Sequence, residues 1–297
     1  MVTRQKSDRF TYQGKSIKAW SLQLYGAPDQ HLRDEAAAAF QAMGPQAVPD
    51  LITLLETKNA FLRKQVWSVA PRLPSKARRI LLRGVKPPDA ASLRAAAARA
   101  LAVIEPAAEP AVPALARALR DKEREVSLSA ATALGRIGKK SVPELIKGLR
   151  EKDPDVRHVS AYALGEVGPD AEPAIPMLIE SLKDQNEYVR GSASYSLARI
   201  GAPALPAVID LLEHGKGIGR QTAAKAVTGF NPPLQTVVPA LLRMAQDDEP
   251  ASRQQALETL AAIRATSSEV VKRLIAALDD PVAEVRLSAI KALAQVS

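Results

Sequence analysis

Residue types that usually carry catalytic chemistry are few and scattered in this sequence of 297 residues. The chain has no cysteine, which excludes disulfides, thiolate metal sites and cysteine nucleophiles and leaves the redox compartment open. No two of the three histidines, His31, His158 and His214, share a helix face. No set of serine, histidine and aspartate and no pair of carboxylates has the arrangement of a catalytic site. We therefore expect no enzymatic activity, no bound metal and no cofactor.

A glycine-rich segment at residues 214–220, HGKGIGR, could in principle hold a phosphate. Glycines let backbone N–H groups approach an anion at the N-terminus of a helix. No strand pattern precedes the segment, so neither the dinucleotide-binding context nor the P-loop context exists. The favoured interpretation is a flexible turn.

Positive charge is concentrated in one segment of the chain. The formal net charge is +9, but residues 61–160 hold 21 Lys/Arg against 10 Asp/Glu, a net of +11, whereas residues 161–297 hold 13 against 16, a net of −3. A concentration of one sign attracts partners of the opposite sign. Aromatic residues are only 4% of the chain, so a base-stacking groove for single-stranded nucleic acid is poorly supplied. The charge therefore favours an acidic protein partner over nucleic acid.

The elements that must position these charges belong to an internal repeat of 30–33 residues. The repeat is anchored by a position that holds arginine in all but one unit: Arg33, Arg63, Arg94, Ser127, Arg157, Arg190, Arg220, Arg253 and Arg286. Seven residues after each anchor stands an apolar residue: Phe40, Ala70, Leu101, Leu134, Leu164, Leu197, Val227, Leu260 and Leu293. This periodicity predicts a helix that buries one stripe in each unit.

Each unit is predicted to contain two helices, called A and B. Helix A carries the anchor and often ends near a glycine, as at Gly44, Gly138, Gly168 and Gly201. Helix B opens at a proline: Pro49, Pro113, Pro143, Pro176, Pro206 and Pro239. We expect nine A helices, eight B helices and no β-sheet.

Three places depart from this pattern. Repeat two, residues 60–89, has prolines near the end of helix A and none at the start of helix B, and residues 230–233 read Phe-Asn-Pro-Pro where glycine is expected. Residues 1–28 lie outside the repeats. A helix over 16–25, containing Trp20, is predicted to cover the exposed end of the first repeat. We expect residues 29–297 to form a single continuous solenoid domain.

Three motifs carry a resemblance to a known family: Ala-Leu-Gly-x-(Ile/Val)-Gly, then Val-Pro-x-Leu-Ile, then Asp-x-x-x-x-Val-Arg. They resemble HEAT repeats, specifically the short repeats of phycobilin-lyase-like bacterial proteins, over roughly residues 29–297. The resemblance implies a right-handed all-α solenoid of about eight and a half two-helix repeats, with the B helices on its concave side. It also implies that each anchor arginine joins a structural ladder with the acidic turn residues beside it: Asp155 precedes Arg157, and Asp184 precedes Arg190.

Aligned B helices place cations at matching positions of three consecutive repeats. Residues i and i+3 lie on one helix face, so we expect a basic strip made of Arg83, Lys86, Arg117, Arg120, Lys147 and Arg150. Attraction of cations to helix C-termini explains the second member of each pair but not the first. The strip is therefore the candidate surface for binding a partner.

These observations predict a non-enzymatic, cytoplasmic scaffold that binds an acidic protein partner on the concave B-helix surface. Two alternatives stay open: nucleic-acid binding on the same strip, and a tetrapyrrole lyase or its chaperone subunit, the latter from the resemblance alone. The polar N-terminal residues and the absence of a long apolar run predict neither a signal peptide nor a membrane span.

Overall fold

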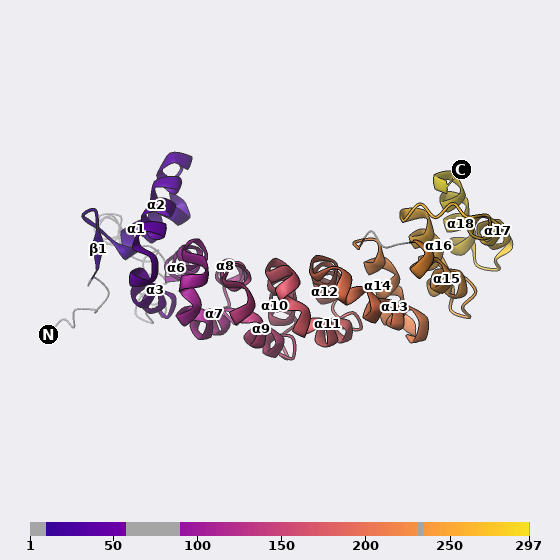
Figure 1. Cartoon of the computed structure of the whole chain (residues 1–297), viewed down its shortest axis with the longest axis horizontal. Helices are drawn as coiled ribbons and strands as arrows, with labels where there is room; N and C mark the ends of the chain where they lie inside the picture. Colours follow the sequence, from indigo (N-terminus) through magenta and orange to yellow (C-terminus); the bar gives the residue numbers. More distant parts are fainter. Residues whose placement is uncertain (1–9, 58–89, 231–233, 297) are drawn as a thin grey trace, which may run out of the picture. The chain divides into compact units, whose positions relative to one another are not determined.

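The computed structural model describes residues 10–57, 90–230 and 234–296 (Figure 1). The chain divides into two compact units, Met1–Ser141 and Val142–Ser297, and each is described by itself. No single helix in the described ranges is long and apolar enough to cross a membrane. In the same ranges, only one pair of helices, Glu187–Ile200 and Ala202–His214, has the length and composition of a membrane span when taken together, and this pair is bent by 119°.

The first unit begins with a small hairpin and a helix that precede the repeats. Strands β1 (Thr11–Tyr12) and β2 (Lys15–Ser16) pair antiparallel. The helices that follow in this unit are α1 (Ile17–Gly26), α2 (Gln30–Met43), α3 (Val48–Leu55), α6 (Ala90–Ile104), α7 (Val112–Ala118) and α8 (Arg124–Ile137). The hairpin has two residues in each strand and lies outside the repeats, and the described chain is otherwise helical, in agreement with the predicted all-α fold.

The second unit alternates A and B helices throughout its described length. Its helices are α9 (Val142–Gly148), α10 (Pro154–Val167), α11 (Ile175–Ser181), α12 (Glu187–Ile200), α13 (Leu205–His214), α14 (Gly217–Val227), α15 (Leu234–Met244), α16 (Pro250–Ala262), α17 (Ser268–Ala276) and α18 (Ala283–Val296). Short 3₁₀ turns link helix A to helix B in several repeats, as at Gly168–Ala174.

The predicted repeat is confirmed wherever the chain is described. Eight A helices (α2, α6, α8, α10, α12, α14, α16 and α18) and seven B helices (α3, α7, α9, α11, α13, α15 and α17) stand at the predicted places in these ranges. The A and B helices expected for repeat two fall among residues 58–89, outside the described residues.

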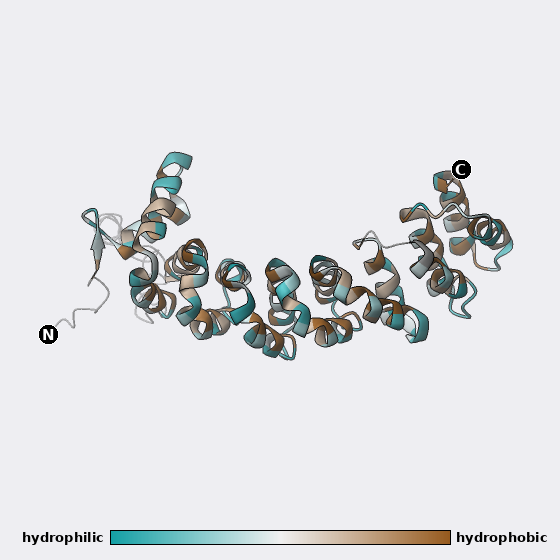
Figure 2. Ribbon diagram, viewed as in Figure 1, coloured by the Kyte–Doolittle hydropathy of each residue, from teal (hydrophilic) through white to brown (hydrophobic). Residues whose placement is uncertain are grey.

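The core is the apolar stripe that the periodicity predicts. Seven of the positions that lie seven residues after an anchor are fully buried: Phe40, Leu101, Leu134, Leu164, Leu197, Val227 and Leu260. Leu293 in α18 is half-buried. Figure 2 shows hydrophobic and hydrophilic parts on each helix, as expected of helices that bury one side. The helix-ending glycines Gly138 and Gly201 have φ of 80° and 86°, a conformation that only glycine adopts at little cost.

Two local predictions need correction. Pro239 lies inside α15 rather than at its start, because this helix begins at Leu234, more than a turn earlier. Helix α1 does not merely cover the first repeat, since it packs against both α2 and α6, the A helix of repeat three. Trp20 anchors it there: the side chain is fully buried and its Nε1 donates a 2.9 Å hydrogen bond to the carbonyl oxygen of Tyr12.

Candidate functional site

The anchor arginines form a ladder, as the sequence suggested, but the carboxylate partner is not the acidic residue beside each arginine. Arg157 donates from Nε and Nη2 to the two carboxylate oxygens of Asp184, at 2.7 and 3.0 Å, and Asp184 lies 27 residues further along, in the next turn. Its Nη1 donates to the carbonyl oxygens of Glu151 and Lys152 in its own turn. The guanidinium therefore joins two consecutive turns, because its planar set of donors is wide enough to bind both.

The same 27-residue pairing recurs in three further repeats: Arg94 with Asp121, Arg220 with Asp247, and Arg253 with Asp280. The hydrogen bond from Arg253 holds the pKa of Asp280 below its ordinary value. Burial acts to raise the pKa of Asp184, but hydrogen bonds from Arg157 and from the backbone of Asn186 outweigh it, and that pKa is lowered too. These arginines hold the repeats together and are not free to bind a partner.

Arg190 is the exception among the anchors of the second unit that have a following repeat. Its Nη1 donates to the carbonyl oxygens of Asp184 and Gln185, at 2.8 and 3.0 Å, as the ladder requires. The residue 27 positions further on is Gly217, however, which has no side chain to accept a hydrogen bond. Within the described part of the chain, no acceptor is seen for Nε and Nη2 of Arg190, the two donors that hold an aspartate in Arg94, Arg157 and Arg253.

The predicted basic strip lies partly outside the described residues. Arg83 and Lys86 fall within 58–89, whereas Arg117 and Arg120 lie on and just after α7 in the first unit. Lys147 and Arg150 occupy the matching positions at the end of α9 in the second unit. All four described side chains are exposed, as a binding surface requires.

These cations already have partners within the chain. Arg117 forms an ion pair with Glu56, and Lys147 with Glu144 at 2.6 Å, but the side chains of Arg117 and Lys147 remain 63% and 67% exposed. Arg120 donates to the carbonyl oxygen of Ala116 at 3.1 Å. Arg150 contacts the sulfur of Met177 at 3.5 Å. Exposed pairs of this kind contribute little to stability, so an external carboxylate can compete for the cations.

His158 and His214 lie in different repeats and make separate contacts within the chain. The Nδ1 of His214 lies 3.1 Å from an oxygen of Asp210 on the same helix, and His158 contacts α12. In the ranges that the structure describes, no three histidine, aspartate or glutamate side chains gather in a way that could hold a metal ion. Within the glycine-rich segment, only Gly215 and Lys216 connect α13 to α14; His214 ends α13, and residues 217–220 begin α14.

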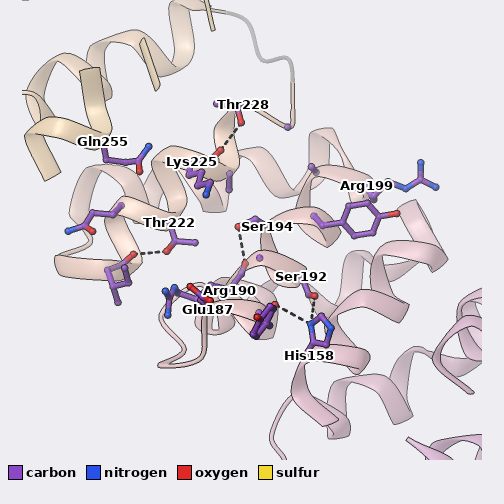
Figure 3. A pocket seen from close by; sticks show the side chains of 18 residues that line it. His158, Glu187, Arg190, Ser192, Ser194, Arg199, Thr222, Lys225, Thr228 and Gln255 are labelled. Carbon is purple, nitrogen blue, oxygen red and sulfur yellow. Dashed lines mark hydrogen bonds between the residues drawn. The ribbon is translucent and has the colours of Figure 1, made fainter. Parts of the chain in front are cut away.

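A hollow on the A-helix surface of the second unit is the feature that sequence reasoning missed. It has a volume of about 920 Å³ and lies mainly between α12 and α14, with His158 of α10 and Gln255 of α16 at its ends (Figure 3). Helix α12 contributes Tyr188, Arg190 and Gly191, and α14 contributes Ile218 and Lys225. The missing aspartate at Gly217 is the sequence signal that could have pointed to it.

The hollow is lined by a glycine, Gly191, at a position where neighbouring repeats have side chains. His158 and Gly191 each follow an anchor arginine by one residue. In α10, the His158 ring reaches α12, where its Nδ1 lies 2.8 Å from Ser192 Oγ, and it packs edge-on against Tyr188 at 6.0 Å. In α12, apart from the helix's own backbone and the chain neighbours of Gly191, no atom lies within 4 Å of the place where a Cβ on Gly191 would stand. The space that His158 fills in one repeat is open in the next.

Tyrosines gather beside the hollow. Tyr162 of α10 and Tyr195 of α12 stack with ring centroids 5.8 Å apart, and the Tyr195 hydroxyl donates a 2.6 Å hydrogen bond to Glu166. That hydrogen bond raises the pKa of Tyr195, and burial raises the pKa of Tyr162. With Tyr188, this surface holds three of the five tyrosines in the chain. Tyrosine is enriched at protein interfaces, since it combines a large apolar ring with a hydrogen-bonding group.

Two-helix repeats stacked through the A and B helices of consecutive units define an α-solenoid. The profile of HEAT repeats matches residues 80–151, 142–227 and 205–294. The chain belongs to the HEAT-repeat family. Among curated proteins, none matches the sequence.

Among solved structures, a karyopherin supports the fold. The chain is similar to the karyopherin Kap121p, with a TM-score of 0.50 and 13% identity over 94% of this chain, although it spans only 37% of Kap121p. It is also similar to the CpcE–CpcF complex of phycocyanin lyase from Nostoc sp. PCC7120, at 18% identity and a TM-score of 0.37 over 100% of both chains. Human deoxyhypusine hydroxylase matches at 20% identity and a TM-score of 0.34 over 94% of this chain and 95% of that one. At 13% identity the likeness to Kap121p bears on the fold alone, and the other two likenesses are too distant to support any conclusion.

Proposed function

We propose that this protein is a non-enzymatic scaffold that binds an acidic protein partner on the B-helix surface of its repeats. One observation carries the proposal. Arg117 and Lys147 on the B helices α7 and α9, and Arg120 and Arg150 just after them, are all exposed at matching positions of two repeats that are consecutive in sequence. Solubility alone favours mixed charges on a surface, whereas recognition concentrates one sign where the partner binds. Kap121p, the karyopherin of similar fold, has been solved bound to the extreme C-terminus of the protein phosphatase Cdc14p.

The internal ion pairs determine how tightly we expect the partner to bind. Glu56 and Glu144 partly neutralise Arg117 and Lys147, so a partner must supply carboxylates that replace them. Exchange of one exposed carboxylate for another changes the free energy little. Affinity must therefore come from several such contacts together, and it is expected to fall as salt screens them.

Charge reversal tests the proposal. The triple variant Arg117→Glu, Lys147→Glu, Arg150→Glu is compared with a matched triple variant on the other side of the repeats, Arg124→Glu, Arg136→Glu, Lys139→Glu, in affinity capture from the source cell with and without nuclease. We expect the first variant to lose a protein partner that the second retains, regardless of nuclease.

Two results would contradict the proposal. Equal loss in both variants would show an effect of net charge rather than a site. Recovery of nucleic acid, with loss of the captured material after nuclease treatment, would favour the nucleic-acid alternative instead. Circular dichroism of both variants checks that the helices are intact.

A further inference from the structure

We propose that the hollow between α12 and α14 binds an acidic peptide segment, which places one carboxylate on Arg190 and an apolar side chain beside Gly191. The site lies on A helices of the second unit and shares no residue with the basic strip. The inference therefore does not rest on the proposed function, and each can fail alone.

The first step concerns the donors of Arg190. In Arg94, Arg157 and Arg253, Nε and Nη2 bind both oxygens of one aspartate, with all six distances between 2.6 and 3.0 Å. Arg190 keeps the Nη1 contacts of the ladder, so its guanidinium is held in place in the same way. Its other two donors face no carboxylate in the described residues, because Gly217 stands at the aspartate position. A guanidinium that is fixed in this way is ready to bind a carboxylate with two parallel hydrogen bonds.

The second step concerns Gly191. Glycine in the interior of a helix is unfavourable because it is the most flexible residue in the unfolded chain. It is usually retained where another group must approach the backbone, as Gly165 shows: a Cβ there would meet Tyr195 Cε1 at 2.6 Å. A Cβ on Gly191 would meet nothing within 4 Å apart from its own helix backbone and its chain neighbours. The room beside this glycine is therefore available to a ligand side chain.

The third step concerns the residues that line the hollow. Tyr188 is 65% exposed and Ile218 is 45% exposed, although both are large and apolar, so a ligand can bury them. The cations Arg199 and Lys225 also line the hollow, against a single carboxylate at Glu187. Figure 3 shows Lys225 and Thr222 of α14 on one side of the space and the α12 residues Arg190 and Ser194 on another. A ligand with spaced carboxylates and apolar side chains matches this combination of charges and surfaces.

A peptide fits better than nucleic acid. The donors left free on Arg190 are those that bind an aspartate carboxylate in three other repeats of this protein. A hollow of about 920 Å³ accommodates a few residues of an extended segment. The chemistry therefore points to short, acidic-apolar protein segments.

The test uses fluorescein-labelled twelve-residue peptides and fluorescence polarisation with the full chain. One peptide alternates Glu and Asp with Leu and Phe; the second replaces each acid by its amide, and the third by lysine. We expect the acidic peptide to bind at least tenfold more tightly than the other two. Gly191→Gln fills the hollow with the residue type that α14 and α16 carry at this position, Gln221 and Gln254. We expect this variant to bind the acidic peptide at least tenfold more weakly, with no decrease in Tm.

Arg190→Lys keeps the charge, loses the paired donors and is expected to weaken binding about fivefold, whereas the triple reversal of Arg117, Lys147 and Arg150 leaves this binding unchanged. Four outcomes would overturn the inference: equal affinity for the acid and amide peptides, full affinity in Gly191→Gln, displacement by inorganic phosphate alone, or tighter binding of a single-stranded oligonucleotide. Self-association that Gly191→Gln abolishes would also overturn it, since the occupant would then be a second copy of the chain.

Discussion

Arg253 and Asp280 are joined by two parallel hydrogen bonds, from Nε to Oδ2 at 2.7 Å and from Nη2 to Oδ1 at 2.8 Å. Both side chains are largely shielded from water, at 13% and 9% exposure. Asp280 also accepts from the backbone N–H of Val282 and so orders the turn that starts α18. One carboxylate thus connects the anchor of one repeat to the turn of the next.

Removal of this carboxylate should weaken the second unit. Asp280→Ala leaves the shielded guanidinium of Arg253 without its partner, and we expect a loss of about 2–3 kcal/mol in the free energy of unfolding. Urea denaturation followed by circular dichroism measures this. Asp279→Ala is the matched control. Because Asp279 is exposed, we expect its replacement to lower the free energy of unfolding by less than about 0.5 kcal/mol. Equal losses at the two positions would show that the ion pair adds nothing.

The ladder also predicts how stability depends on pH. The folded-state pKa values of Asp184 and Asp280 are lowered from the ordinary value, so their stabilising contribution is complete above about pH 5. It is lost as the pH falls through those lowered pKa values, since protonation removes the charge that each arginine binds. In urea titrations, the stability difference between the natural chain and Asp184→Asn, Asp280→Asn should be constant above about pH 5 and shrink below it. A difference independent of pH down to 2 would contradict this assignment.

The repeat positions could be predicted because each rests on local rules of helix formation. Leu134 and Leu164 are buried since they recur with the helical period, and Gly138 closes α8 since it adopts positive φ. The partners of the anchor arginines could not be predicted in this way. A pairing 27 residues away depends on how consecutive turns face one another, which the sequence of a single unit does not show.

The hollow escaped prediction for a related reason. Gly191 and Gly217 are each unremarkable in sequence, since glycine is common near turns and tolerated in helices. Their meaning comes from what the other repeats place at the same positions: a side chain that reaches the next helix, as His158 does, and an aspartate that binds the preceding arginine. Only a comparison of all repeats at these two positions would have shown that both groups are missing from the same junction.

Tight packing of the A helices predicts a cost for added volume. Ala131 of α8 is fully buried, so Ala131→Leu must displace its neighbours, and we expect a loss of about 1–3 kcal/mol. Ala38→Leu in α2 is the matched control, because that alanine is exposed and the larger side chain projects into solvent. Urea midpoints of the two variants make the comparison. An unchanged midpoint for Ala131→Leu would show that the buried side of α8 has been assigned wrongly.

Two helical glycines in adjacent repeats should respond to alanine with opposite signs. Gly165 lies in the interior of α10, where a Cβ would stand 2.6 Å from Tyr195 Cε1 and 2.8 Å from Ser196 Oγ, so Gly165→Ala must push α10 and α12 apart. We expect a loss of about 1–3 kcal/mol. Gly191 lies in the interior of α12 with open space around it, so Gly191→Ala gains the helix propensity of alanine without a clash, a stabilisation of about 0.5–1 kcal/mol. Thermal unfolding of both variants and of the natural chain measures this: we expect Tm to fall for Gly165→Ala and to rise for Gly191→Ala. If Gly191→Ala lowered Tm as Gly165→Ala does, the space beside Gly191 would be occupied in solution, and the hollow could not receive a ligand.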